Sequence, residues 1–413
     1  MGNLEIFIHV ACSISVIIIS ARILGNVMQF IKQPRVVGEM IAGVALGPTL
    51  FGVIFPEGST YLFSNTQPYI YVLGNIGLSF YMFLVGIDLD LSNIAKKTKR
   101  KAYALSLIAT IIPFMFGCLS AYLFYNQFQI SGVPVILFML FLGTAFSIMA
   151  FPMLARILEE EKLINTPLGS ICLLSASIQD VMTWILLAFI TAIASTGNCF
   201  NGFVTLFGAC IFILLVRFII KPILEKINVS LLISGKLSQN QFAIILVLLL
   251  IAAVITDKIG LYSVFGGFIL GLNIPKSKIL ISQIKEKLQD VMVVLLLPLF
   301  FAFSGLKTNF LVLGSSNLLM PCLVILCFAF ISKYGSVLIT MKSFGYSWRE
   351  SSAIGGLINA RGLMVLIVAN IGLDYKIINS NLYSILVLLA VLSTLAAMPI
   401  YKMSLNKLKI VKE

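Results

Sequence analysis

Residues 143–156 read Gly-Thr-Ala-Phe-Ser-Ile-Met-Ala-Phe-Pro-Met-Leu-Ala-Arg, an apolar helix interrupted by proline and by small or hydroxyl-bearing residues. A second apolar segment is interrupted at residues 355–364, which read Gly-Gly-Leu-Ile-Asn-Ala-Arg-Gly-Leu-Met. Proline removes a backbone donor and glycine relaxes the backbone, so both stretches are expected to carry unpaired backbone groups. Inside a bilayer, such groups are tolerated only where protein or a water-filled cavity surrounds them.

Apolar segments of helical length make up most of the chain. Of its 413 residues, 60% are hydrophobic and 11% are charged, and the mean hydropathy is +1.06. In lipid only helices and closed barrels satisfy every backbone group, and runs of about 20 residues match a helix rather than a barrel strand. The sequence predicts an all-α polytopic membrane protein with 13 transmembrane helices. They are expected at residues 4–29, 35–52, 69–88, 102–125, 133–157, 166–195, 202–221, 241–256, 259–273, 288–306, 318–341, 350–372 and 381–401.

The formal net charge of +13 could suggest a nucleic-acid partner, but the positions of the basic residues argue against one. Most lysines and arginines fall on alternate loops, including the run at 96–101, while the opposite loops hold Lys258, Lys307 and Lys376. This asymmetry is the positive-inside pattern of a multi-pass protein. It predicts an extracellular N-terminus and a cytoplasmic C-terminus, in the inner (plasma) membrane of the cell, and no nucleic-acid partner.

The two interrupted segments are the fifth and the twelfth of the thirteen. If residues 201–235 form a linker, segments 1–6 and 8–13 become two six-helix halves with the broken helix fifth in each. An offset of seven segments gives these halves opposite topology. Inverted repeats with broken helices at matching positions indicate a transporter site near the midplane, where the two broken helices cross. The competing interpretation is that glycine and proline are simply frequent in membrane helices.

Asp180 lies in Ser-Ala-Ser-Ile-Gln-Asp-Val-Met-Thr-Trp (175–184), deep within an apolar segment. A carboxylate at membrane depth costs a few kcal/mol, so membrane proteins keep one mainly where it handles an ion or a proton. Lys333 and Arg361 are two further charges within apolar segments: Lys333 lies in the segment before the second interruption and Arg361 lies within that interruption.

Several long motifs resemble the monovalent cation:proton antiporter superfamily, specifically its second branch of sodium/proton, potassium-efflux and plant cation/proton exchangers. They are the stretches at 33–48, 83–91, 150–158, 179–180, 297–306 and 359–372. The resemblance implies a secondary active antiporter that exchanges Na⁺ or K⁺ for H⁺ by alternating access, assembled as a homodimer in the lipid bilayer. It also implies a dimerisation part (1–95 and 236–310), a mobile core part (100–200 and 316–404), the linker at 201–235 and a short cytoplasmic tail at 405–413.

A monovalent cation needs several oxygen ligands, and at least one should be anionic if the cation is to compete with a proton. We expect Asp180 to supply the anion and Ser177, Ser147 and Thr144 to add neutral oxygens from the same region. Each hydroxyl could equally bond back to its own preceding turn. Gln179 occupies a position where the family commonly has a second acid or an asparagine, and Met149 replaces a threonine of the plant-like pattern.

With Gln179 beside Asp180, the expected partner of Lys333 is open. The ammonium must find Asp180, bind a backbone carbonyl at a broken helix, or lose its proton. Both a counter-charge for the empty site and a structural tie between crossing helices remain possible. Arg361 is expected to cap carbonyls exposed by the break, because its guanidinium has five fixed donors. Asn359 is expected to help at the same crossing.

The rival hypothesis is a cation channel or potassium efflux pore of the same architecture, in which Asp180 selects ions without obligatory exchange. An enzyme is not expected, because no nucleophile-base pair, phosphate-binding loop or metal-ligand cluster is present. The seven cysteines lack metal-ligand spacing, and we expect them to pack as small apolar side chains. No cofactor is expected beyond the transported Na⁺ or K⁺ and H⁺.

Overall fold

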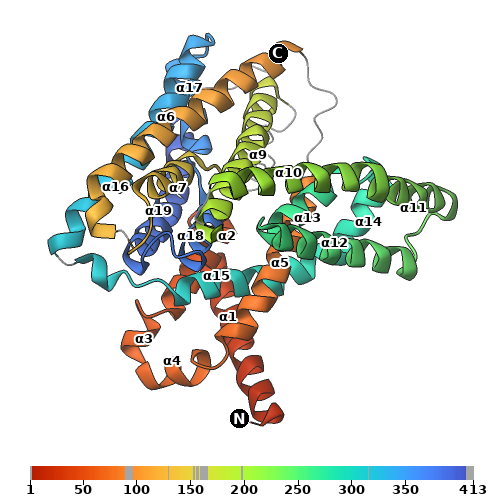
Figure 1. Ribbon diagram of the computed structural model, residues 1–413, viewed down its shortest axis with the longest axis horizontal. Helices are drawn as coiled ribbons and strands as arrows, with labels where there is room; N and C mark the ends of the chain where they lie inside the picture. Colours follow the sequence, from red (N-terminus) through yellow and green to blue (C-terminus); the bar gives the residue numbers. More distant parts are fainter. Residues whose placement is uncertain are drawn as a thin grey trace. The chain divides into compact units, whose positions relative to one another are not determined.

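The structure is a computed structural model that describes residues 2–88, 96–128, 130–151, 154, 158, 166–196, 199–314 and 316–405. In these ranges every regular element is a helix (Figure 1). The predicted all-α fold class is therefore confirmed.

Ten helical stretches in the described ranges are long and apolar enough to cross a membrane. An eleventh candidate is the pair Trp348–Ile358 and Gly362–Asp374, which is bent by 41° at a short break. Two apolar helices, Val135–Ser147 and Ser263–Leu272, are shorter than a span. Each of the thirteen expected segments thus has helical structure, while the count of thirteen spans stays a prediction.

Two compact units make up the chain. The first contains Met1–Leu24, Gly38–Asp90 and Thr191–Leu306, and the second contains Gly25–Val37, Leu91–Ile190 and Lys307–Glu413. The predicted division into a dimerisation part, a core part and a linker stays a prediction. The roles assigned to the two parts are taken up below as proposals.

The first unit is built of long spans with several short or irregular helices between them. Its elements are α1 (Asn3–Phe30), α2 (Arg35–Leu46), α3 (Phe51–Ile54), α4 (Pro56–Phe63), α5 (Gln67–Asp88), α10 (Cys199–Leu215), the π-helix η1 (Val216–Ile220), α11 (Lys221–Ser234), α12 (Gln239–Ile259), α13 (Ser263–Leu272), α14 (Lys278–Val291), the π-helix η2 (Met292–Leu296) and α15 (Leu297–Leu306). The C-terminal end of α1 and the first residues of α2 fall in the second unit by the boundaries above.

Close packing in the first unit depends on small residues. A Cβ on Gly305 would lie 2.0 Å from the backbone of Gly43, and a Cβ on Gly271 would lie 2.1 Å from the carbonyl oxygen of Phe83. Such contacts let helix backbones approach one another where lipid provides no hydrophobic driving force. They bring α2 against α15 and α5 against α13.

The second unit holds both interrupted segments. Its elements are α6 (Lys96–Phe128), α7 (Val135–Ser147), α9 (Pro167–Thr196), the 3₁₀ helix η3 (Leu311–Gly314), α16 (Ser316–Ser343), α17 (Trp348–Ile358), α18 (Gly362–Asp374) and α19 (Ser380–Leu405). Within it α6 packs on α7 and α16, and α17 packs on α16 and α19. Gly117 and Gly143 allow α6 and α7 to touch, since a Cβ on Gly117 would lie 2.6 Å from the Cα of Gly143.

Candidate functional site

The two interrupted helices meet at their breaks. The first helix, α7, ends at Ser147, and Ile148 is extended with φ −59° and ψ 145°. The second break separates α17 from α18 at residues 359–361. The backbone N–H of Ala150 donates a hydrogen bond of 3.2 Å to the carbonyl oxygen of Ala360. One break therefore satisfies a backbone group of the other, as the prediction of two crossing broken helices requires. Pro152, Met153, Ala155 and Arg156 of the first motif lie outside the described residues.

Gly362 begins α18 in a conformation that favours glycine. Its φ is +42°, in the left-handed region where a side chain would be strained. Its N–H donates to the Thr394 hydroxyl of α19 at 3.0 Å. The second break is therefore held by a specific backbone geometry and a buried side-chain acceptor.

Arg361 is fully buried beside both breaks. Its Nη1 donates to the carbonyl oxygen of Ala145, near the end of α7, at 3.3 Å, and its Nη2 donates to the carbonyl oxygen of Ala329 in α16. Its guanidinium also lies 5.9 Å from the centre of the Phe146 ring. These contacts are those of a carbonyl cap, and they join α18 to α7 and α16.

Lys333 of α16 is fully buried, and its ammonium donates to three oxygens. The Nζ lies 2.5 Å from Gln179 Oε1, 2.6 Å from the carbonyl oxygen of Ser147 and 2.8 Å from the carbonyl oxygen of Ala109 in α6. An ammonium has three N–H groups, so these acceptors use all of them. We call Ala109 O, Ser147 O and Gln179 Oε1 the ammonium cradle; none of its oxygens carries a formal charge.

The side-chain amide of Gln179 is oriented by its other contacts. Its Nε2 donates to Ser175 Oγ at 3.1 Å and to the Ser175 carbonyl at 3.3 Å, one turn earlier in α9. The same nitrogen lies 3.8 Å from the sulfur of Met149. Because the nitrogen faces these acceptors, the oxygen faces Lys333.

Asp180 is the next residue of α9 and is 1% exposed. Neither carboxylate oxygen has a hydrogen-bond partner among the described residues. Lys333 lies close enough to interact with Asp180 electrostatically, yet its three N–H groups point to the cradle. A buried carboxylate without donors costs several kcal/mol unless it takes up a proton or a cation. The carboxylate is therefore ready to bind either one.

The three expected hydroxyl ligands are buried and donate to carbonyls of their own helices. Thr144 donates to Leu140 O at 2.8 Å, and Ser177 donates to Leu174 O at 2.9 Å. Ser147 donates to Gly143 O at 2.9 Å and to Thr110 O of α6 at 3.0 Å. These are the backward bonds of the alternative interpretation. They leave the lone pairs of each oxygen available, because a hydroxyl both donates and accepts.

Lys333, Gln179 and Ser147 are thus joined directly, and Arg361 reaches the end of the same broken helix. The side-chain oxygen and nitrogen of Asn359 at the second break are buried and have no partner in the described ranges. The sequence analysis expected carbonyls at the broken helices but missed the carbonyl of Ala109 in α6 as a partner of Lys333. The available signal was Pro113, because a proline frees the carbonyl four residues before it.

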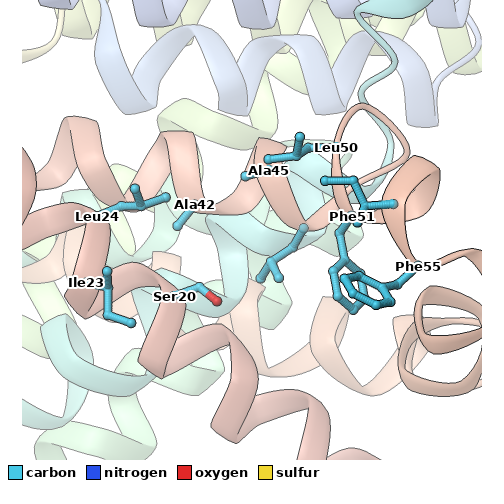
Figure 2. Close-up of a pocket in the computed structure, with 10 residues that line it drawn as sticks. Ser20, Ile23, Leu24, Ala42, Ala45, Leu50, Phe51 and Phe55 are labelled. Carbon is cyan, nitrogen blue, oxygen red and sulfur yellow. The ribbon is translucent and has the colours of Figure 1, made fainter.

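A hollow elsewhere in the protein has a different character. It has a volume of about 290 Å³ and lies in the first unit, between α1, α2 and the α3 region (Figure 2). Apart from Ser20, its lining is apolar, with Ile23, Ala42 and the ring of Phe51 among the contributing side chains. A hollow without charged groups is unsuited to an ion.

The comparison with protein families identifies the chain. The family described as "Sodium/hydrogen exchanger, transmembrane" matches residues 15–403. The chain belongs to this exchanger family. Membership makes it a multi-pass integral membrane transporter of monovalent cations and protons, and not an enzyme.

Similar exchangers occur in bacteria, plants and yeast. The chain is 37% identical over 397 residues to the Na⁺/H⁺ antiporter NhaS4 of Synechocystis, covering 95% of this chain and 96% of that protein. It is 34% identical to cation/H⁺ antiporter 18 of Arabidopsis thaliana and 30% identical to K⁺/H⁺ antiporter 1 of Saccharomyces cerevisiae. These matches cover 94% and 96% of this chain but only 48% and 46% of those proteins, so it spans about half their length.

A solved exchanger has the same fold. The structure of the sodium proton antiporter MjNhaP1 from Methanocaldococcus jannaschii at pH 8 aligns with a TM-score of 0.61, over 99% of this chain and 100% of that one. The sequences are 15% identical in this alignment. The likeness therefore concerns the fold, which agrees with the family assignment.

Proposed function

We propose that this exchanger is a secondary active antiporter that carries Na⁺ or K⁺ against H⁺, with the cation and the proton competing for Asp180. The observation that carries the proposal is the state of this carboxylate: it is 1% exposed, and neither oxygen has a hydrogen-bond partner in the described ranges. Burial without donors favours binding of a positive charge, and one carboxylate cannot hold a proton and a cation together.

Neutral oxygens complete the site. Ser177, Ser147 and Thr144 retain lone pairs while they donate to carbonyls, so they can contribute to a cation shell around Asp180. The amide of Asn359 has unpaired polar atoms at the second break and can support the same region. Gln179 contributes indirectly, since its oxygen binds the Lys333 ammonium.

Lys333 then serves as a held counter-charge. Its positive charge is stabilised by hydrogen bonds to three neutral oxygens and not by a direct ion pair, so Asp180 stays available to transported ions. Arg361 ties the two breaks together without taking part in proton transfer, because a guanidinium keeps its proton in proteins.

Alternating access would move the core part, residues 100–200 and 316–404, against a dimerisation part, residues 1–95 and 236–310. The 201–235 stretch would connect the two, with the protein working as a homodimer in the inner (plasma) membrane. The basic loops support an extracellular N-terminus and a cytoplasmic C-terminus. The family assignment favours exchange over a channel of the same architecture.

The proposal includes both Na⁺ and K⁺ because the relatives' names include a Na⁺/H⁺ antiporter and a K⁺/H⁺ antiporter. The test uses the purified protein in proteoliposomes with an imposed pH gradient and a pH-sensitive dye inside. Addition of Na⁺, K⁺ or Li⁺ in turn should dissipate the gradient only for the transported cation.

Asp180→Asn tests the assigned carboxylate in the same assay. We expect loss of cation-dependent proton movement, because the amide cannot exchange a proton for a cation. Asp374→Asn is the matched control: this aspartate pairs with Lys307 at 3.1 Å, is partly exposed, and should leave exchange unchanged. Full exchange by Asp180→Asn would refute the proposed function.

A further inference from the structure

Three prolines stand inside helices of the second unit, and each frees one carbonyl. Pro113 lies in α6, Pro321 in α16 and Pro399 in α19. A helical proline lacks the N–H that would bond the carbonyl four residues earlier, and its ring crowds that carbonyl. The freed groups are the carbonyls of Ala109, Asn317 and Leu395.

Each freed carbonyl accepts a hydrogen bond from a side chain distant in sequence. The carbonyl of Leu395 accepts from Gln33 Nε2 at 3.3 Å, and that of Asn317 accepts from Gln127 Nε2. The carbonyl of Ala109 accepts from Lys333 Nζ at 2.8 Å. The first two donors are neutral amides, whereas the third is a fully buried ammonium. Of these three carbonyls, only the one freed by Pro113 accepts a hydrogen bond from a charged group.

The ammonium cradle can be explained by local backbone chemistry. Ala109 contributes a carbonyl because Pro113 follows it by four residues, and Ser147 contributes one because α7 ends there. Gln179 contributes a side-chain oxygen whose direction is fixed by Ser175. Loss of one acceptor would leave an N–H of a buried ammonium free, and the nearby Asp180 carboxylate attracts this positive charge.

We propose that Pro113 is a positioning residue for ion exchange: it keeps Lys333 on neutral oxygens and so prevents the ammonium from occupying Asp180. The inference rests on the proposed function and extends it to a residue that touches neither the cation nor the carboxylate. In Pro113→Ala, the restored N–H would share the Ala109 carbonyl with Lys333. A carbonyl oxygen has two lone pairs, so the ammonium would lose part of this bond and not all of it.

The experiment measures cation binding and not only transport. Purified protein is titrated with Na⁺ and K⁺, and the half-saturating concentration is taken from the rise in Tm that a ligand of the folded state produces. For Pro113→Ala we expect an increase of about fivefold, which corresponds to weakening one hydrogen bond to a charged group. Pro321→Ala and Pro399→Ala repair helices in the same way without touching Lys333, and they should leave the half-saturating concentration unchanged.

A double-mutant cycle shows whether the effect passes through Lys333. Lys333→Gln retains a donor for the cradle but removes the charge that competes with the cation. In this background Pro113→Ala should change the half-saturating concentration by less than about twofold, the usual limit for uncoupled sites. If Lys333→Gln does not fold, Lys333→Met serves as the background of the cycle instead.

The outcomes are distinct. An unchanged half-saturating concentration in Pro113→Ala, or an equal rise in Pro321→Ala, would overturn the positioning role. Persistence of the rise without the lysine would overturn it as well. Failure of the wild-type protein to exchange any of the three cations would instead refute the proposed function, and with it this inference. Exchange by the wild type together with an unaffected Pro113→Ala would leave the proposed function standing and remove only the role of Pro113.

Discussion

Gln179→Leu isolates the contribution of the one cradle member that is a side chain. Leucine is similar in size to glutamine but has no oxygen for Lys333 and no N–H for Ser175. In the wild type the Gln179 oxygen lies 2.5 Å from the ammonium, the shortest of its three contacts. A hydrogen bond to a charged group contributes roughly 1.5–3 kcal/mol, so this is the scale of the loss.

The loss can appear in either of two measurements. If the ammonium stays in place, the free energy of unfolding falls by about 2 kcal/mol or more, because a buried charged donor is left unpaired. If it turns to Asp180, stability is largely kept and the cation must displace it. Since 1.4 kcal/mol is tenfold in an equilibrium constant, the cation KM would then rise by about tenfold or more. The electrostatic proximity of Asp180 and Lys333 leads us to expect the second result.

The assay combines the cation KM, from proton flux in proteoliposomes, with the Tm of the purified protein. Gln127→Leu is the matched control, since it makes the same substitution at an exposed amide that donates to a freed carbonyl but contacts no charge. The expected result is a higher KM with a modest change in Tm for Gln179→Leu alone. A KM equal to that of the wild type, with a Tm also unchanged, would show that Gln179 does not hold the ammonium.

Two further variants test the break and the stoichiometry. Gly362→Ala places a side chain at φ +42° and should lower the free energy of unfolding by about 1–2 kcal/mol, seen as a lower Tm. The control Gly335→Ala, with nothing within 4 Å of its added Cβ, should keep the Tm of the wild type. Equal Tm values for the two variants would argue against strain at the break. For the wild type we expect electroneutral exchange of one cation for one proton. Gln179→Asp adds a second carboxylate beside Lys333, and its exchange should become electrogenic. An exchange rate of Gln179→Asp that does not change with an imposed membrane potential would contradict this.

Much of the fold could be predicted because its determinants are local. The length and apolarity of the segments required membrane helices, and proline, glycine and other small residues in two of them indicated the breaks. Element boundaries were harder to predict. The seventh segment was expected to end at Lys221, before Pro222, but helical structure continues through η1 and α11 to Ser234. Proline is tolerated in the first turn of a helix, so it did not end this one.

The candidate site was predictable only for its side chains. Asp180 stands out because a carboxylate in an apolar segment is costly. The cradle around Lys333 depends on carbonyls of Ala109 and Ser147, and carbonyl directions follow from backbone geometry that side-chain patterns do not report. The hydrogen bonds of Ser177 and Thr144 to the preceding turn could not be predicted either, because a hydroxyl in a helix has local and distant partners of similar energy.

Competition at Asp180 is the central claim, and the pH dependence of the cation KM tests it most directly. The KM and the maximal rate are measured by cation-dependent flux at a series of pH values, with Asp374→Asn as the surface control. If one proton and one cation exclude each other at a single carboxylate, the KM should rise by about tenfold for each unit of falling pH once the protonated form predominates. The maximal rate at saturating cation should stay nearly constant over that range. A KM independent of pH, with a maximal rate that falls instead, would contradict the account.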